Sequence, residues 1–253
     1  MKAMVLAAGL GTRLRPLTDD RPKALVEVGG RTMLELTLTR LKRFGVREAI
    51  VNTHHFAEMI DGYLLANGHF GMRIGVSREE ELLDTGGGLK NAAWFFLECA
   101  ESELGEPFLV HNVDVLSTID LGSMVRAHRE SGALATLAVQ EREASRYLLF
   151  DQQGRLAGRR KGDDGEPEWV YPEHSEVDST ALAFCGIHVI SPRIFAEMEE
   201  EGAFSIIDAY LELARKGERV MAFRADGARW RDLGRPESVV KAAEELAAGM
   251  YGG

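Results

Sequence analysis

The chain of 253 residues is poor in cysteine and has no long apolar run. Its two cysteines, Cys99 and Cys185, stand far apart and in no Cys-x-x-Cys or Cys-x-x-His pattern, which argues against a disulfide framework and a cysteine-based zinc site. We expect both to be reduced thiols in the core. No apolar stretch approaches the roughly 20 residues of a membrane-spanning helix, and glycines rather than a cleavage site follow the first apolar run. A cytoplasmic protein without a membrane partner is therefore expected.

Positive charge is also scarce, because 30 lysines and arginines face 40 acidic residues and the formal net charge is -10. Nucleic-acid binding relies on a broad basic surface, so no nucleic-acid partner is expected. A small phosphorylated substrate stays open, since it needs only a local cluster of cations.

Apolar runs typical of buried strands alternate with helical patterns through the first half of the chain. Leu34, Leu38 and Leu41, for example, recur at helical spacing in a segment that stops at Gly45. This alternation indicates βαβ units and a mostly parallel sheet. We expect strands at 3–7, 49–52, 72–76 and 108–112, and helices at 33–44, 56–65, 89–99 and after Asp120.

The second half has a different pattern, because segments 147–151 and 155–159 flank a Gln-Gln-Gly turn and predict a β-hairpin. Strands are expected at 181–190, 220–223 and 228–231, and helices at 206–216 and 237–248. No linker or repeat divides the chain. The simplest interpretation is one α/β domain, 1–253, with a small antiparallel insertion.

Ligands of open parallel sheets bind beyond the carboxyl ends of the strands. The first predicted strand is followed by Ala8-Gly9-Leu10-Gly11-Thr12-Arg13, where glycines let the backbone approach a phosphate and arginines add charged donors. Leu14 stands where a dinucleotide fingerprint has its third glycine, and no P-loop lysine follows. This motif alone is a weak signal. A nicotinamide-dependent oxidoreductase is therefore an alternative function at this point.

The continuation RPLTDDRPKAL strengthens the case for phosphate chemistry. Pro16 and Pro22 stiffen a long loop that ends at Lys23. A lysine held in this way can meet a phosphate as a point charge and stabilise the negative charge that develops there.

The segment LAAGLGTRLRPLTDDRPKAL resembles the signature of the sugar-1-phosphate nucleotidyltransferases, or nucleoside-diphosphate-sugar pyrophosphorylases, roughly L-A-A-G-x-G-T-R-L-x-P-L-T followed by P-K. The chain is most similar to short members without a β-helix domain, such as those that act on N-acetylmuramate 1-phosphate or mannose 1-phosphate. The resemblance implies a Rossmann-like three-layer α/β/α nucleotidyltransferase fold. It also implies a nucleotide-binding half near 1–120 and an acceptor-binding half near 121–253, with the antiparallel insertion on the sugar side.

The implied reaction joins an NTP to a sugar 1-phosphate and releases pyrophosphate by in-line attack on the α-phosphorus. Positioning and charge neutralisation dominate catalysis in such transfers. UTP or GTP is favoured and CTP or dTTP is possible, but neither the base nor the sugar follows from the motifs. The alternatives are a cytidylyltransferase for a non-sugar phosphate such as choline phosphate, and a non-catalytic nucleotide-sugar sensor.

The resemblance also assigns residue roles. Arg13 and Lys23 would be catalytic, and Asp114 and Asp232 would bind Mg²⁺, which prefers one or two carboxylates and completes its shell with phosphate and water. The nucleotide would contact Leu6, Ala7, Ala8, Gly9, Gly11, Thr12, Arg13, Lys23, Thr85, Gly86 and Gly87, with the glycines leading into a helix. The acceptor would contact Asn112, Lys161 and Gly186. Around Lys161 the family pattern is broken, because Arg160 replaces its acidic residue and no proline follows.

Overall fold

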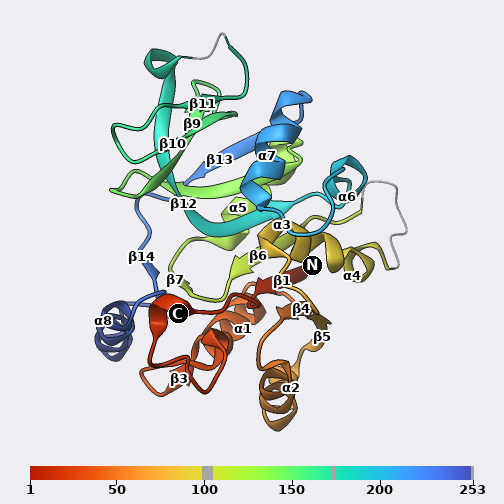
Figure 1. The fold of residues 1–253 in the computed structure, drawn as a ribbon, viewed down its shortest axis with the longest axis vertical. Helices are drawn as coiled ribbons and strands as arrows, with labels where there is room; N and C mark the ends of the chain where they lie inside the picture. Colours follow the sequence, from red (N-terminus) through yellow and green to blue (C-terminus); the bar gives the residue numbers. More distant parts are fainter. Residues whose placement is uncertain (99–104, 173–174, 252–253) are drawn as a thin grey trace.

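The fold is taken from a computed structural model that describes residues 1–98, 105–172 and 175–251. The described residues form a ten-stranded sheet with the order β11-β10-β9-β12-β6-β1-β4-β5, which β8 and β13 join beside β12 (Figure 1). The central strands β1, β4, β5 and β6 run parallel, so the expected α/β class with a parallel centre is confirmed. Their bounds are β1 (Lys2–Leu6), β4 (Glu48–Thr53), β5 (Arg73–Arg78) and β6 (Phe108–Asn112).

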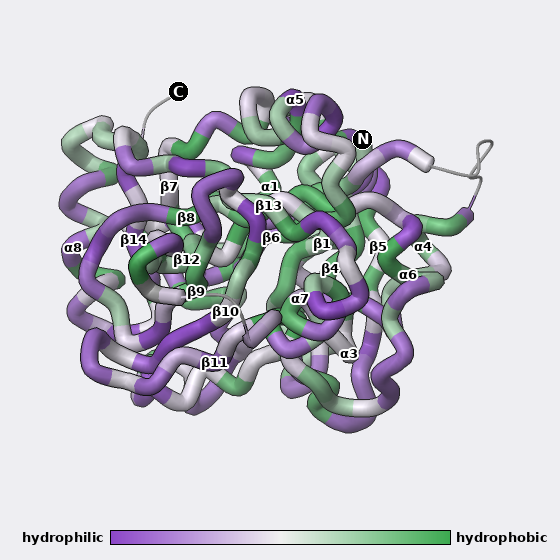
Figure 2. The backbone as a smooth tube through the Cα atoms, turned by 90° about the horizontal axis from the view of Figure 1, so that it is seen from above, coloured by the Kyte–Doolittle hydropathy of each residue, from purple (hydrophilic) through white to green (hydrophobic). Residues whose placement is uncertain are grey.

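Helices cover both faces of this sheet. Successive side chains of β1 point to opposite faces, and all of them from Ala3 to Leu6 are apolar, so each face needs a covering layer. Ala3 and Val5 face one apolar core and Met4 and Leu6 face the other. The first core receives residues of α1 (Met33–Arg43), α2 (Ala57–Ala66), α5 (Leu121–Ser131) and α8 (Pro236–Ala247). The second receives residues of α3 (Asp84–Asn91), α4 (Ala93–Leu97), α6 (Ile194–Glu197) and α7 (Ile206–Arg215). The three-layer Rossmann-like arrangement is thus present, with apolar strands inside and polar segments outside (Figure 2).

The antiparallel part continues the main sheet through the long strand β12 (Ser179–Ile190), which pairs with β6, β8 and β9. The predicted hairpin is present as β9 and β10. Strand β8 was not predicted, because its fully buried run ATLAVQ lacks the alternation that marks a strand with one solvent-exposed face. The remaining strands are β8 (Ala135–Gln140), β9 (Arg146–Asp151), β10 (Leu156–Lys161), β11 (Glu168–Trp169) and β13 (Val220–Arg224).

Two short ladders bring distant segments together. Strand β7 (Val115–Ser117) pairs with β14 (Trp230–Asp232), and β2 (Glu27–Val28) pairs with β3 (Arg31–Thr32). Helix α8 lies beside the β2–β3 hairpin, so the end of the chain packs on its beginning (Figure 1). No helix among the described residues has both the length and the apolar character that crossing a bilayer requires.

One predicted helix has the wrong bounds. Instead of a single helix over 89–99, α3 begins at Asp84 and ends before α4 begins at Ala93. The glycines 86–88 therefore lie inside a helix and not in a loop that leads into one. Cys99 lies outside the described residues, whereas Cys185 is a buried free thiol as expected.

Candidate active site

Lys23 lies along the glycine loop that follows β1. A Cβ atom at Gly9 would stand 3.2 Å from the Lys23 Nζ, and one at Gly11 would stand 3.0 Å from the Lys23 Cβ. Gly11 also has a positive φ of 64°, which disfavours any other residue. Both glycines are therefore needed for the lysine to lie directly on the loop.

The ammonium group of Lys23 reaches across to Asp114, which follows β6. Lys23 Nζ lies 3.2 Å from Asp114 Oδ2, and their side chains are only 14% and 17% exposed. Burial disfavours the charged carboxylate, but the charge and hydrogen bond of Lys23 outweigh it and hold the pKa of Asp114 below its usual value. Lys23 comes directly after Pro22, whose carbonyl accepts a hydrogen bond from the Leu25 N–H at 2.9 Å. The base of the lysine is thus fixed by a short turn.

Asp232 joins this site through the β7–β14 ladder. The ladder places Asp232 opposite Val115, and the Leu233 N–H donates to the Asp114 carbonyl at 2.8 Å. Asp232 Oδ1 accepts a hydrogen bond from the Gly234 N–H at 2.7 Å, and Asp232 Oδ2 lies 3.9 Å from Arg13 Nη1. The two predicted metal ligands therefore belong to neighbouring segments, although 117 residues separate them in the chain.

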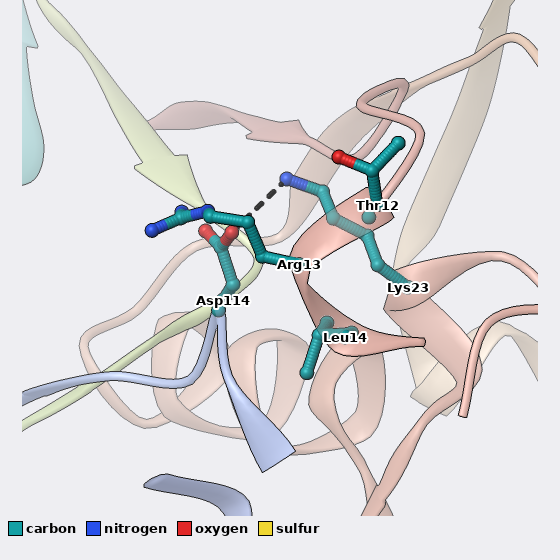
Figure 3. Close-up of a pocket in the computed structure, with 7 residues that line it drawn as sticks. Thr12, Arg13, Leu14, Lys23 and Asp114 are labelled. Carbon is teal, nitrogen blue, oxygen red and sulfur yellow. Dashed lines mark hydrogen bonds and ion pairs between the residues drawn. The ribbon is translucent and has the colours of Figure 1, made fainter. Parts of the chain in front are cut away.

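A cleft of about 120 Å³ opens between these groups. Figure 3 shows Lys23 and Arg13 reaching toward Asp114 from the loop after β1. Two cations and a carboxylate line this cleft, and a second carboxylate, Asp232, lies beside Arg13. Such a mixture suits a polyphosphate with a divalent ion, because the cations can bind phosphate and the carboxylates can bind the ion. The lining residues are Gly11, Thr12, Arg13, Leu14, Lys23, Asp114 and Gly234.

The donor set fits magnesium. Asp114 supplies a hard carboxylate in the lining of the cleft, and Asp232 supplies a second one beside it, next to Arg13. The Asp232 side chain is 45% exposed, so its Oδ2 is within reach of an ion. A third acidic, histidine or cysteine ligand is not grouped with them in the described part of the chain. Two carboxylates with phosphate and water oxygens match the octahedral shell that Mg²⁺ prefers.

A buried polar network that was not predicted from the sequence lies at the start of the loop after β1. Asn52 Oδ1 accepts from the Ala7 N–H at 2.7 Å, and Asn52 Nδ2 donates to Glu79 Oε1 at 2.7 Å. Glu79 Oε2 accepts from the Leu83 N–H at 3.0 Å. The available signal was the position of Asn52 and Glu79 at the carboxyl ends of two successive strands. This network fixes the end of β1 relative to the start of α3.

The glycines of α3 have a packing role that the motif does not reveal. A Cβ at Gly86 would come within 2.4 Å of the Phe204 ring, and one at Gly87 within 2.2 Å of the Gly202 carbonyl. The hydroxyl of Thr85 accepts a hydrogen bond from the Ile206 N–H at 3.0 Å. Segment 202–206 thus covers one side of the glycines, and their contact with a base stays a prediction.

Two of the three predicted acceptor residues lie together. Gly186, with a φ of 71°, packs on the Asn112 amide, because a Cβ there would stand 2.8 Å from the Asn112 Nδ2. Lys161 is exposed at the end of β10, opposite Arg146, and does not line the cleft. The structure therefore brings together Asn112 and Gly186 but gives Lys161 no contact with them.

Comparison with known proteins assigns the family. The nucleotidyl transferase family model matches residues 2–249. The chain belongs to the nucleotidyl transferase family. It is 35% identical over 97% of its length to an N-acetylmuramate α-1-phosphate uridylyltransferase of Caulobacter vibrioides, with 96% of that protein covered. It is 31% identical, again over 97% of its length and 96% of the relative, to a UTP–glucose-1-phosphate uridylyltransferase of Haloferax volcanii.

Solved structures share the fold of this chain. A UDP-glucose pyrophosphorylase complexed with UDP-glucose superposes with a TM-score of 0.75 at 17% identity, with 98% of each chain covered. Because the chain is a nucleotidyltransferase, the cations and carboxylates around the cleft are candidates for contacts with a nucleotide. The roles of the individual side chains in this cleft stay predictions.

Proposed function

We propose that this nucleotidyltransferase transfers a nucleoside monophosphate from an NTP to a sugar 1-phosphate, with release of pyrophosphate and formation of an NDP-sugar. The observation that carries the proposal is the cleft lined by Lys23, Arg13 and Asp114, with Asp232 beside Arg13. Relatives that cover nearly the whole chain are named as sugar-1-phosphate uridylyltransferases, which supports the same reaction. A cytoplasmic setting, where NTPs are available, is part of this proposal.

Lys23 and Arg13 would hold the triphosphate, because they are the cations that line the cleft. During attack on the α-phosphorus, negative charge accumulates on its oxygens and on the departing pyrophosphate. A preorganised ammonium group stabilises that charge without reorganising, and contact with Gly9 and Gly11 holds Lys23 in place. The backbone of the loop after β1 would line the nucleotide.

Asp114 and Asp232 would hold Mg²⁺ against the phosphates. The ion would neutralise phosphate charge as a Lewis acid when bound. In the free enzyme the Lys23 ammonium group neutralises Asp114. This ion pair compensates the charge of a buried carboxylate. The same ammonium group lines the cleft, where it would also meet the triphosphate.

The uridylyltransferase relatives favour UTP as donor, and GTP is the second candidate because mannose-1-phosphate guanylyltransferases are also among the relatives. A cytidylyltransferase for choline phosphate remains as an alternative acceptor class. The oxidoreductase alternative loses its support, since the family assignment accounts for the Gly9-x-Gly11 pattern and the cationic loop together.

The test is pyrophosphate release across ATP, CTP, GTP, UTP and dTTP, combined with a panel of sugar 1-phosphates and choline phosphate. We expect release with at least one NTP, only when a sugar 1-phosphate and Mg²⁺ are present, and an NDP-sugar as product. Release with choline phosphate instead would support the alternative acceptor. Specific nucleotide binding without turnover of any pair would favour a sensor and contradict the proposal.

A further inference from the structure

Arg142, in the loop between β8 and β9, is held in an ordered position by two contacts. Its guanidinium carbon lies 3.7 Å from the centre of the Trp230 ring, a stacked cation–π arrangement. Its Nη2 donates to the Phe184 carbonyl at 2.9 Å. An arginine fixed on an aromatic ring loses little further freedom when it binds a ligand.

The charge of this arginine is uncompensated within the described part of the chain. Its neighbour Glu141 pairs with Arg224, and no ion pair joins Arg142 to a carboxylate there. The Cys185 thiol nearby cannot serve as a counterion, since burial raises its pKa to about 12 although Arg142 acts in the opposite direction. The buried Arg142 Nε has no hydrogen-bond partner among the described residues. Of the five guanidinium donors, one therefore binds the Phe184 carbonyl and the Nε–H has no partner among the described residues.

The position of Arg142 connects it to the acceptor side of the site. Its stacking partner Trp230 and the predicted metal ligand Asp232 share one face of β14, about 7 Å apart along the strand. The Trp230 Nε1 donates to the Cys185 carbonyl at 2.8 Å, and the next residue, Gly186, packs on Asn112. Asp232 in turn lies 3.9 Å from Arg13, and Asp114 lies 3.2 Å from Lys23.

We propose that Arg142 is an acceptor-binding residue whose guanidinium takes an oxyanion of the incoming phosphorylated sugar. The inference rests on the proposed function and deepens it by naming the group that selects an anionic acceptor. The oxyanion is the 1-phosphate itself or a carboxylate on the sugar ring, and both match the planar donors of arginine. Arg142 would then be the cation that binds the acceptor, in place of Lys161, which is exposed and does not line the cleft.

The test measures dissociation constants by calorimetry for UTP, glucose 1-phosphate and glucuronic acid 1-phosphate, and KM values for whichever NTP and acceptor turn over. The variants are Arg142→Met, Arg142→Lys and, as a matched loss of one exposed cation, Arg43→Met. Loss of a charge-assisted hydrogen bond predicts that Arg142→Met weakens acceptor binding roughly 10-fold or more and leaves UTP binding within two-fold of wild type. Arg142→Lys should recover part of the loss, and Arg43→Met should resemble wild type.

A loss with both acceptors identifies the phosphate as the group bound, and a loss with the glucuronic acid compound alone identifies the carboxylate. Acceptor binding within two-fold of wild type in Arg142→Met overturns the assignment, as does a wild type that binds neither acceptor. Equal weakening of UTP and acceptor would mean that Arg142 only supports Trp230 and β14, which also overturns it. Because binding is measured without turnover, an inactive wild type contradicts the proposed function while Arg142 is still tested.

Discussion

At the scale of single residues, the site depends on the contact between Lys23 and Asp114. Each group is largely buried, and each makes the charge of the other tolerable. The family resemblance predicted both residues, and the proline-stiffened loop that ends at Lys23 gave independent support for the lysine. Their direct contact was not predictable, since it depends on how the loop after β1 folds back over Gly9 and Gly11.

Replacing Asp114 with Asn tests its role as a metal carboxylate. We expect kcat/KM for pyrophosphate release to fall roughly 100-fold or more, because a neutral amide neither holds Mg²⁺ strongly nor pairs with Lys23. Asp120→Asn is the matched control, since Asp120 caps α5 through the Ser123 N–H at 3.0 Å and asparagine caps equally well. Equal activities of the two variants, at matched melting temperature, would contradict the metal assignment.

At the scale of elements, α3 shows what a motif leaves out. Gly86 and Gly87 were predicted to contact the nucleotide, and the structure adds a second requirement from Gly202 and Phe204, more than 100 residues later. Sequence patterns found the central strands and most helices because their apolar periods are local. They missed β8 and the β7–β14 ladder, since a fully buried strand has no alternation and a short ladder depends on a distant partner.

Gly87→Ala should therefore destabilise the protein. The new Cβ would meet the Gly202 carbonyl at 2.2 Å, and forcing these backbones apart costs about 1–3 kcal/mol, a fall of several degrees in melting temperature. Gly62→Ala in α2 is the matched control, because no atom lies within 4 Å of its Cβ and alanine favours a helix. A melting temperature of Gly87→Ala that equals or exceeds that of Gly62→Ala would contradict the close packing of α3 on segment 202–206.

At the scale of the whole molecule, three buried histidines make the free energy of unfolding depend on pH. Burial lowers the pKa of His111 and of His128 to about 4 and that of His188 to about 3. His188 Nδ1 lies 2.7 Å from the Tyr210 hydroxyl and His128 Nδ1 lies 2.9 Å from the Thr136 hydroxyl, so both are placed as neutral rings. All three therefore take up protons more readily in the unfolded chain.

The free energy of unfolding should fall as the pH is lowered from about 6.5, where unfolded histidine titrates, toward 4. The slope is about 1.4 kcal/mol per pH unit for each histidine, because each binds a proton in the unfolded state only. Urea unfolding at pH 7, 6 and 5 measures this slope. His128→Gln removes one of the three protons, so it should reduce the slope by about 1.4 kcal/mol per pH unit. A free energy of unfolding that stays constant over this range would contradict the neutral, buried state of these side chains.

The account as a whole is tested most directly by the rate of pyrophosphate release in Lys23→Ala. The measurement uses the NTP and sugar 1-phosphate that the wild type prefers, at saturating Mg²⁺, with Lys241→Ala on the exposed face of α8 as control. Lys23→Ala removes the ammonium group that meets the triphosphate, so kcat/KM should fall roughly 100-fold or more while Lys241→Ala matches wild type. A folded Lys23→Ala enzyme with the kcat/KM of the wild type would show that the cleft beside Asp114 is not where the transfer occurs.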